Sequence, residues 1–179
     1  MMKNIFLSLV LLFLYAISFG QVRTSPKINW VKRDTIPYSY SYPNSWKLNR
    51  AKLMGTDFIL YAPVEGVGSS DFRPNINLLV QDLTANPLSI KEYQKLSLDQ
   101  IPQFLTHSQI ILNEIKKGAH GEYIHMIYAG KLGMNPLKFE QYIYLHSQKA
   151  YVLTLTSTPQ HFDLDKVQGE EILKRFTLK

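Results

Sequence analysis

The feature that most constrains the fold is a run of four strand-like segments in the C-terminal half of the chain. From Gln109 onward, apolar and polar residues alternate with a period of two, which is typical of a β-strand with one buried face. The sequence predicts strands at Gln109–Lys116, Glu122–Ala129, Lys138–His146 and Tyr151–Ser157. Short turns at 117–121, 130–136 and 148–149 join them. Short connections make neighbouring strands antiparallel, so the predicted class is α+β rather than doubly wound α/β.

Earlier strands are predicted from the same kind of pattern. Tyr38, Tyr40 and Tyr42 alternate with serines, which places all three rings on one face of a strand. Short apolar runs predict further strands at Phe58–Ala62 and Asn75–Leu83. The segment between them, Val64–Pro74, is rich in glycine and serine and is predicted to be a loop.

One helix is predicted to begin at Ser89. Its hydroxyl can cap the backbone while Glu92, three residues later, returns a bond to Ser89, the reciprocal arrangement of a capping box. Pro102 is expected to kink or divide this helix because proline lacks a backbone donor. One helical face is predicted to carry Ile90, Tyr93, Leu96, Ile101, Phe104 and Leu105.

A second helix is predicted shortly before the C-terminus. His161, Asp163 and Asp165 resemble metal-binding or acid/base residues when taken alone, but aspartates at that place are explained by helix capping and the helix dipole. The residues expected to turn toward the sheet are Val167, Ile172 and Leu173, followed by Phe176.

The N-terminus has the pattern of an export signal. Lys3 precedes the apolar stretch Ile5–Ile17, which has the length of a signal-peptide core and falls short of a membrane-spanning helix. Ser18 and Gly20 are small residues at the positions that signal peptidase requires, so cleavage is expected before Gln21. A cut after Ser18 is the alternative.

The chain contains no cysteine, so no disulfide supports the fold and no thiol is present for lipid attachment. We therefore expect a periplasmic or secreted protein without a stable membrane anchor after cleavage. The predicted organisation is a signal peptide at 1–20, an extended arm at 21–36 and one domain at 37–179.

Charge and motifs exclude several classes of function. The formal net charge of +6 is spread along the chain and no nucleic-acid-binding module is present, so no nucleic-acid partner is expected. No Gly-x-Ser-x-Gly motif occurs. The glycines of Gly66–Ser70 are not followed by Gly-Lys-Ser/Thr, so this segment is interpreted as an exposed loop. We expect a protein that is not an enzyme and has no cofactor.

Histidines provide the one speculative metal site. If the hairpin folds about Gly133, His120 lies opposite His146, and Glu122 points the same way. The hypothesis depends on register, because a slip of one residue places the two histidines on opposite faces. Ordinary surface histidines near strand ends are the alternative interpretation. The tyrosines likewise allow two interpretations, an aromatic binding platform or simple strand propensity.

Five pieces of the chain form a recognisable order: Tyr38–Pro43 with Trp46, Asn75–Leu78, the helix start at Ser89, Ala150–Thr154 and Ile172–Phe176. This order resembles the PsbP-like family, named after an extrinsic subunit of the photosynthetic oxygen-evolving complex and including many exported bacterial proteins. The resemblance implies an antiparallel sheet with helices packed on both faces, and a role in binding or assembly rather than catalysis.

Three functions remain open at this point. The first is a non-catalytic binding or assembly module of the bacterial cell envelope, with an envelope protein as its partner. Its contact surface would be a sheet face or the Val64–Pro74 loop. The second is a periplasmic carrier or sensor of a small ligand or metal, and the third is an enzyme of unrecognised type. A concave, mostly apolar pocket would favour the second, and an exposed apolar or aromatic patch without a deep pocket the first. An enzyme would add strongly perturbed ionisable groups inside the pocket.

Overall fold

The computed structural model describes residues 27–63 and 72–179. The predicted signal peptide, the start of the arm and most of the Val64–Pro74 loop lie outside the described residues. The elements are β1 (Trp30–Asp34), β2 (Tyr38–Pro43), β3 (Lys47–Asn49), a 3-10 turn η1 (Leu53–Gly55), β4 (Thr56–Tyr61), β5 (Asn75–Asp82), α1 (Ile90–Phe104), β6 (Thr106–Gly118), β7 (Gly121–Leu132), β8 (Asn135–His146), β9 (Lys149–Ser157), α2 (Phe162–Lys174) and β10 (Thr177–Leu178).

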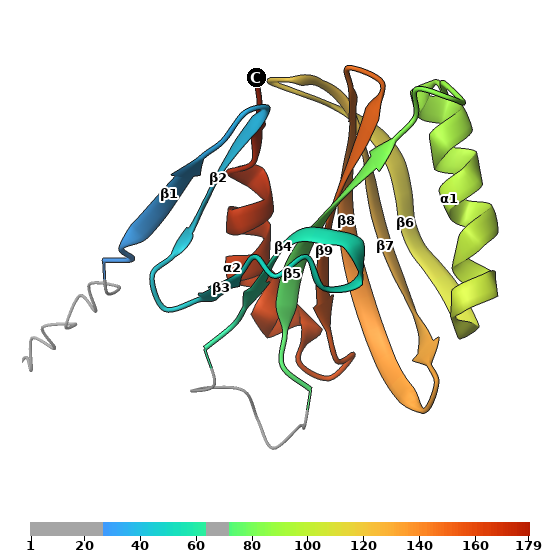
Figure 1. The fold of residues 1–179 in the computed structure, drawn as a ribbon. Coiled ribbons are helices and arrows are strands. Elements are labelled where there is room, and N and C mark those ends of the chain that lie inside the picture. Colours follow the sequence, from blue (N-terminus) through green and yellow to red (C-terminus); the bar gives the residue numbers. More distant parts are fainter. Residues whose placement is uncertain (1–26, 64–71) are drawn as a thin grey trace, which may run out of the picture.

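The centre of the molecule is a seven-stranded antiparallel sheet in the order β3-β4-β5-β9-β8-β7-β6. Its β6–β9 part is the predicted run of four strands joined by tight turns. The helix α1 lies against one face of this sheet, over β6 and β7 (Figure 1). In the part of the chain that the structure describes, no helix is long and apolar enough to cross a membrane.

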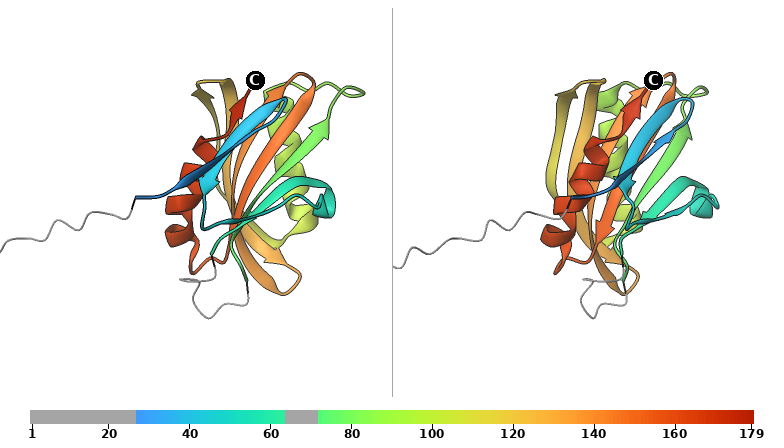
Figure 2. Two further views of the ribbon diagram at one scale, coloured as in Figure 1. Left: turned by 60° about the vertical axis from the view of Figure 1, so that its left-hand side comes forward. Right: turned by 90° about the vertical axis from the view of Figure 1, so that its left-hand side faces the viewer.

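The prediction of a single sheet is corrected by a second, three-stranded sheet in the order β1-β2-β10. Part of the predicted arm forms β1, which pairs with β2 from Trp30 opposite Pro43 to Asp34 opposite Ser39. The small sheet lies beside α2, on the face of the large sheet away from α1 (Figure 2). Short two- to five-residue strands at chain ends carry little periodicity, which is why β10 and β1 were not predicted.

Both faces of the large sheet are covered, as expected from the sequence. Along β9, Leu153 and Leu155 belong to the core beneath α2 and the small sheet. Their neighbours Ala150 and Val152 belong to a second core beneath α1. Because successive side chains of a strand point to opposite faces, one strand supplies both cores. The face shared by Tyr38, Tyr40 and Tyr42 is confirmed, since all three are buried in the α2-side core.

The helix α1 begins as predicted. The Ser89 hydroxyl accepts a hydrogen bond from the Glu92 backbone N–H at 3.3 Å, and Glu92 accepts one from the Ser89 N–H at 2.8 Å. Pro102 does not divide the helix, because it sits in the last turn where few bonds remain to be broken. The predicted face is wrong at two positions: Leu96 and Phe104 are exposed.

The helix α2 is capped differently from the prediction. Its N-cap residue is His161, without a side-chain capping bond, and the two aspartates lie inside the first turn. Asp165 accepts a hydrogen bond from the hydroxyl of Ser157, while Asp163 lies 3.6 Å from the ammonium of Lys138. Val167 is 72% exposed rather than turned toward the sheet, whereas the burial of Ile172, Leu173 and Phe176 is confirmed.

A close approach at Gly130 fixes the end of α1 on the sheet. A β-carbon at this position of β7 would lie 2.9 Å from Cβ of Leu105 and 3.2 Å from the backbone oxygen of Thr106.

Replacing Gly130 by alanine should therefore lower the free energy of unfolding by about 1–3 kcal/mol, measured by urea denaturation. The neighbouring exposed change Lys131→Ala should alter it by less than about 0.5 kcal/mol. Equal stability of the two variants would contradict this packing.

Candidate functional site

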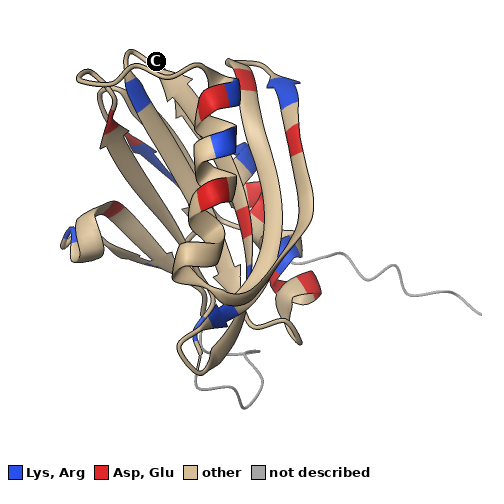
Figure 3. Cartoon of the chain, turned by 90° about the vertical axis from the view of Figure 1, so that its right-hand side faces the viewer, with Lys and Arg blue, Asp and Glu red and all other residues tan. Residues whose placement is uncertain are grey.

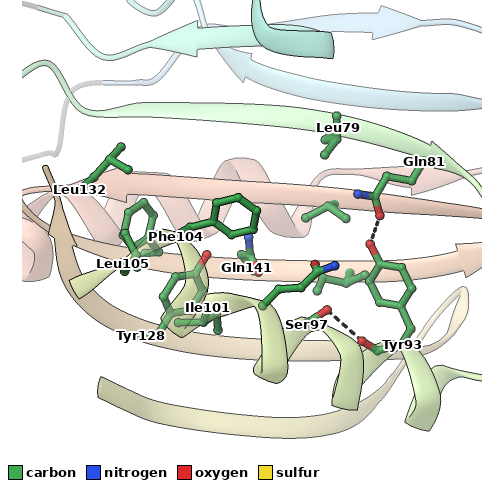
Figure 4. Close-up of a pocket in the computed structure, with 14 residues that line it drawn as sticks. Leu79, Gln81, Tyr93, Ser97, Ile101, Phe104, Leu105, Tyr128, Leu132 and Gln141 are labelled. Carbon is green, nitrogen blue, oxygen red and sulfur yellow. Dashed lines mark hydrogen bonds between the residues drawn. The ribbon is translucent and has the colours of Figure 1, made fainter. Parts of the chain in front are cut away.

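A pocket of about 480 Å³, open to solvent, lies between α1 and the large sheet. Its volume is within the range of about 300–1,000 Å³ that is usual for small-molecule sites. The pocket is lined by residues of α1 and of β5, β7, β8 and β9 (Figure 4): Leu79, Gln81, Tyr93, Ser97, Gln100, Ile101, Phe104, Leu105, Tyr128, Leu132, Phe139, Gln141, Ile143 and Val152.

The pocket exists because α1 covers only part of its sheet face. Only Leu105 separates the end of α1 from the start of β6, the edge strand, so the helix is held over β6 and β7. The strand before α1 is β5, on the other side of β9 and β8. The side chains of Leu79 and Val152 on β5 and β9 therefore face a hollow rather than the helix backbone.

Polar groups are few and are placed on opposite walls of the pocket. The Tyr93 hydroxyl of α1 donates a hydrogen bond across the gap to the side-chain oxygen of Gln81 on β5 (Figure 4). On the floor, the Gln141 amide donates to the Thr154 hydroxyl at 3.0 Å, and this leaves the Gln141 oxygen available as an acceptor. The Ser97 hydroxyl donates to the Tyr93 backbone oxygen at 2.9 Å.

Among the described residues that line the pocket, none has an acidic, basic or histidine side chain. Burial raises the pKa of Tyr93 to about 12 and also raises the pKa of Tyr128, so both hydroxyls stay neutral near pH 7. The tyrosine ring of Tyr128 stacks on Phe139, with ring centroids 4.9 Å apart. The site can therefore offer apolar surface and neutral hydrogen-bonding groups, but no group that would exchange a proton near neutral pH.

The predicted pairing of His120 with His146 was wrong. In the β7–β8 hairpin Leu132 lies opposite Asn135, so Gly133 and Met134 together form a two-residue turn. This shifts the register by one residue from a hairpin centred on Gly133. His120 lies in the turn before β7, and His146 pairs with Lys149 of β9. In the described ranges 27–63 and 72–179, no three His, Cys, Asp or Glu side chains gather in a way that could hold a metal.

A buried pair of ionisable side chains was missed by the sequence analysis. His125 of β7 and Glu140 of β8 lie on the α2 side of the sheet, with the histidine Nε2 2.7 Å from the glutamate Oε1. Their side chains are 7% and 0% exposed. The remaining atoms, Nδ1 of His125 and Oε2 of Glu140, are buried and make no hydrogen bond with the described residues. A glutamate at an inward position of an alternating strand was the available signal.

This pair continues into a network that reaches α2. Lys166 lies 4.0 Å from Oε1 of Glu140 and 3.0 Å from Glu170. Glu114 of β6 lies 3.5 Å from the other ring nitrogen of His125, and its hydrogen bond with Lys116 lowers the pKa of this carboxyl group. None of these residues lines the pocket. We interpret the network as a structural clamp between α2 and the sheet.

Eight tyrosines are buried, including those of β2, β8 and β9: Tyr38, Tyr40, Tyr42, Tyr93, Tyr128, Tyr142, Tyr144 and Tyr151. On the described strands the tyrosines therefore build the two cores rather than an exposed platform. The structure favours the interpretation from strand propensity and core packing.

Removal of one member of the buried pair should be costly. Glu140→Ala leaves His125 buried without its partner and should lower the free energy of unfolding by about 3–5 kcal/mol, measured by chemical denaturation. The matched change Glu114→Ala affects a half-exposed carboxylate and should cost less than about 1 kcal/mol. The double variant His125→Phe, Glu140→Leu should recover most of the loss, because apolar side chains leave no buried polar atom without a partner. A double variant as unstable as Glu140→Ala would refute the clamp.

Comparisons with known proteins show which solved structures share this fold. No protein-family model and no curated protein sequence matches the chain. Among solved structures, cyanobacterial PsbP (CyanoP) from Synechocystis sp. PCC 6803 is similar with a TM-score of 0.63 at 14% identity, covering 90% of this chain and 99% of CyanoP.

Two further structures have the same fold. The Ran-binding protein Mog1p of Saccharomyces cerevisiae gives a TM-score of 0.58 at 8% identity, covering 85% of this chain and 96% of Mog1p. LpqN, involved in cell envelope biogenesis of Mycobacterium tuberculosis, gives a TM-score of 0.55 at 9% identity, and the match covers 85% of this chain and 91% of LpqN. The resemblance inferred from the sequence is confirmed at the level of architecture: the chain has the Mog1p/PsbP-like fold.

Proposed function

We propose that this chain is a non-catalytic binding protein that takes a small, uncharged and largely apolar molecule into the pocket between α1 and the sheet. The observation that carries the proposal is the pocket itself, about 480 Å³ in volume and without a charged lining residue. A carboxylate or ammonium group would lose its hydration there without gaining an opposite charge. An uncharged ligand loses little hydration free energy on entering the pocket, and its apolar surface is buried against the apolar side chains of the sheet.

The absence of catalysis is part of the proposal and is supported by the same lining. Acid/base and nucleophilic catalysis need a titratable or activated group within reach of the substrate. The lining tyrosines stay neutral near pH 7, and the Ser97 hydroxyl donates a hydrogen bond to a backbone carbonyl oxygen. The paired His125 and Glu140 are buried on the other side of the sheet.

We further propose that the protein acts outside the cytoplasm, in the periplasm or after secretion. The support is the sequence alone: the apolar stretch Ile5–Ile17 after Lys3, and small residues before Gln21. A cysteine-free chain is compatible with an oxidising compartment. Sequencing the N-terminus of the protein recovered from its host tests this, and a mature protein that still begins at Met1 argues against export.

Assembly in the cell envelope is the second candidate function. It is supported by the fold shared with LpqN, a protein involved in cell envelope biogenesis, together with the expected export. The partner would be an envelope protein. A stoichiometric protein captured from the envelope fraction of the host by the tagged chain, and absent with a tag-only control, would favour this candidate over ligand carriage.

Filling the pocket should weaken ligand binding without unfolding the protein. Ser97→Phe directs a ring from α1 into the hollow and should weaken binding of the uncharged fluorescent probe N-phenyl-1-naphthylamine at least about tenfold, measured by fluorescence titration. Lys95→Phe puts the same ring on the outward face of α1 and serves as the control, with binding unchanged. Circular dichroism checks that both variants fold. Equal binding by the two variants would place the probe elsewhere.

The neutral lining also predicts charge selectivity. Decan-1-ol should displace the probe at a concentration about tenfold or more below that required for decanoate, because the carboxylate finds no cation in the pocket. Probe affinity should also be constant between about pH 5 and pH 9, since no lining side chain titrates in that range. A stronger effect of decanoate, or a marked pH dependence, would contradict a neutral site.

A further inference from the structure

Three large apolar side chains are exposed around one end of the pocket. Phe104, the last residue of α1, is 70% exposed, and Leu132, the last residue of β7, is 52% exposed. Both line the pocket and lie near one another at its end (Figure 4). Met134, in the turn that follows Leu132, is 91% exposed. We call these three residues the apolar rim.

The backbone presents the rim at the tip of a hairpin. Gly133 has a φ of +61°, which allows the two-residue turn between β7 and β8. Leu132 and Met134 flank Gly133 in this hairpin, and the end of α1 lies beside the tip of the hairpin (Figure 1). Folding therefore leaves apolar surface exposed where the pocket opens, although a monomer would be expected to cover it.

The charge around the rim has one sign. The charged residues of α1 all lie before Gln100, so its last five residues carry none (Figure 3). In the segments 100–113 and 130–138 no acidic residue occurs, and the basic ones are Lys131, Lys138 and the histidine His107. Lys131 is exposed and forms no ion pair with another described residue, whereas Lys138 is near Asp163. The chain as a whole carries a net charge of +6.

We propose that the apolar rim docks on an anionic lipid bilayer, with Phe104, Leu132 and Met134 inserted at the headgroup level and Lys131 near the lipid phosphates. Exposed apolar side chains next to a lysine, with no carboxylate between them, match the requirements of interfacial binding. Binding is peripheral and reversible. The pocket then opens toward the membrane, from which an apolar ligand can enter without crossing water.

A bilayer fits the rim better than a second protein does. A stable protein interface takes about 20–30 residues from each partner, and the rim offers three apolar side chains at a narrow tip. Insertion into a lipid interface needs no complementary shape, and its strength grows with buried apolar area. The role of the membrane as ligand source rests on the proposed function, whereas the docking itself does not.

Cosedimentation with vesicles tests the docking. The chain from Gln21 onward should sediment with phosphatidylcholine vesicles containing about 30% phosphatidylglycerol, and less with phosphatidylcholine alone or at high salt. The double variant Leu132→Ser, Met134→Ser should lower the partition coefficient about tenfold or more, and Met134→Ser alone by a smaller factor. The matched control is Leu164→Ser, Val167→Ser, which removes two similarly exposed apolar residues from α2 and should leave vesicle binding unchanged.

Two further measurements separate this proposal from the ligand site. Ser97→Phe should keep vesicle binding while binding the fluorescent probe more weakly. Met134→Ser should bind the probe in solution as the unchanged protein does, while its partition onto vesicles is reduced. No sedimentation with anionic vesicles, or an equal loss in the α2 control, would overturn membrane docking. Light scattering that shows concentration-dependent dimers abolished by Met134→Ser would instead assign the rim to contact between copies.

Discussion

The structure depends on one strand, β9, whose side chains are buried on both faces of the sheet. From Ala150 to Ser157 every residue of this strand is buried, with Leu153 and Leu155 on one side and Ala150 and Val152 on the other. Successive side chains of a strand point to opposite faces of the sheet. Because β9 is apolar on both faces, each face must be covered by other structure. One face is closed by α2 and the small sheet, the other only partly by α1, and the pocket is the uncovered remainder.

The two faces differ in how they handle polar groups. On the α2 side, Glu140 and His125 are fully enclosed and connected to α2 through Lys166, so polar atoms there hold elements together. On the α1 side, Gln81 and Gln141 are amides at the wall of an open space. A buried charge is costly unless it is paired, whereas an amide facing a pocket can exchange water for a ligand. The polar contacts that join α2 to the sheet and the proposed binding pocket thus lie on opposite faces of the same sheet.

Local patterns predicted much of the fold, but not what depends on the relative placement of elements. The alternation after Gln109 and the capping pair at Ser89 are encoded by neighbours in sequence, and both elements formed as expected. The pairing of His120 with His146 failed because a two-residue turn and a turn centred on Gly133 differ by one residue, which periodicity does not resolve. The pocket and the His125–Glu140 pair were missed for the same reason: each requires the strand register or the position of α1.

Because side chains of β9 alternate between two different environments, its positions also differ in which substitutions they tolerate. Positions facing α2, such as Leu155, are constrained by a packed core, while Val152 faces the space where a ligand would lie. Substitutions that are separated by the sheet and share no partner tend to have additive effects on stability. A lineage can therefore alter the α1-facing positions one at a time, and so change the shape of the pocket, without repacking the α2 side. This gives one physical route by which proteins with 8% to 14% identity to this chain retain its architecture.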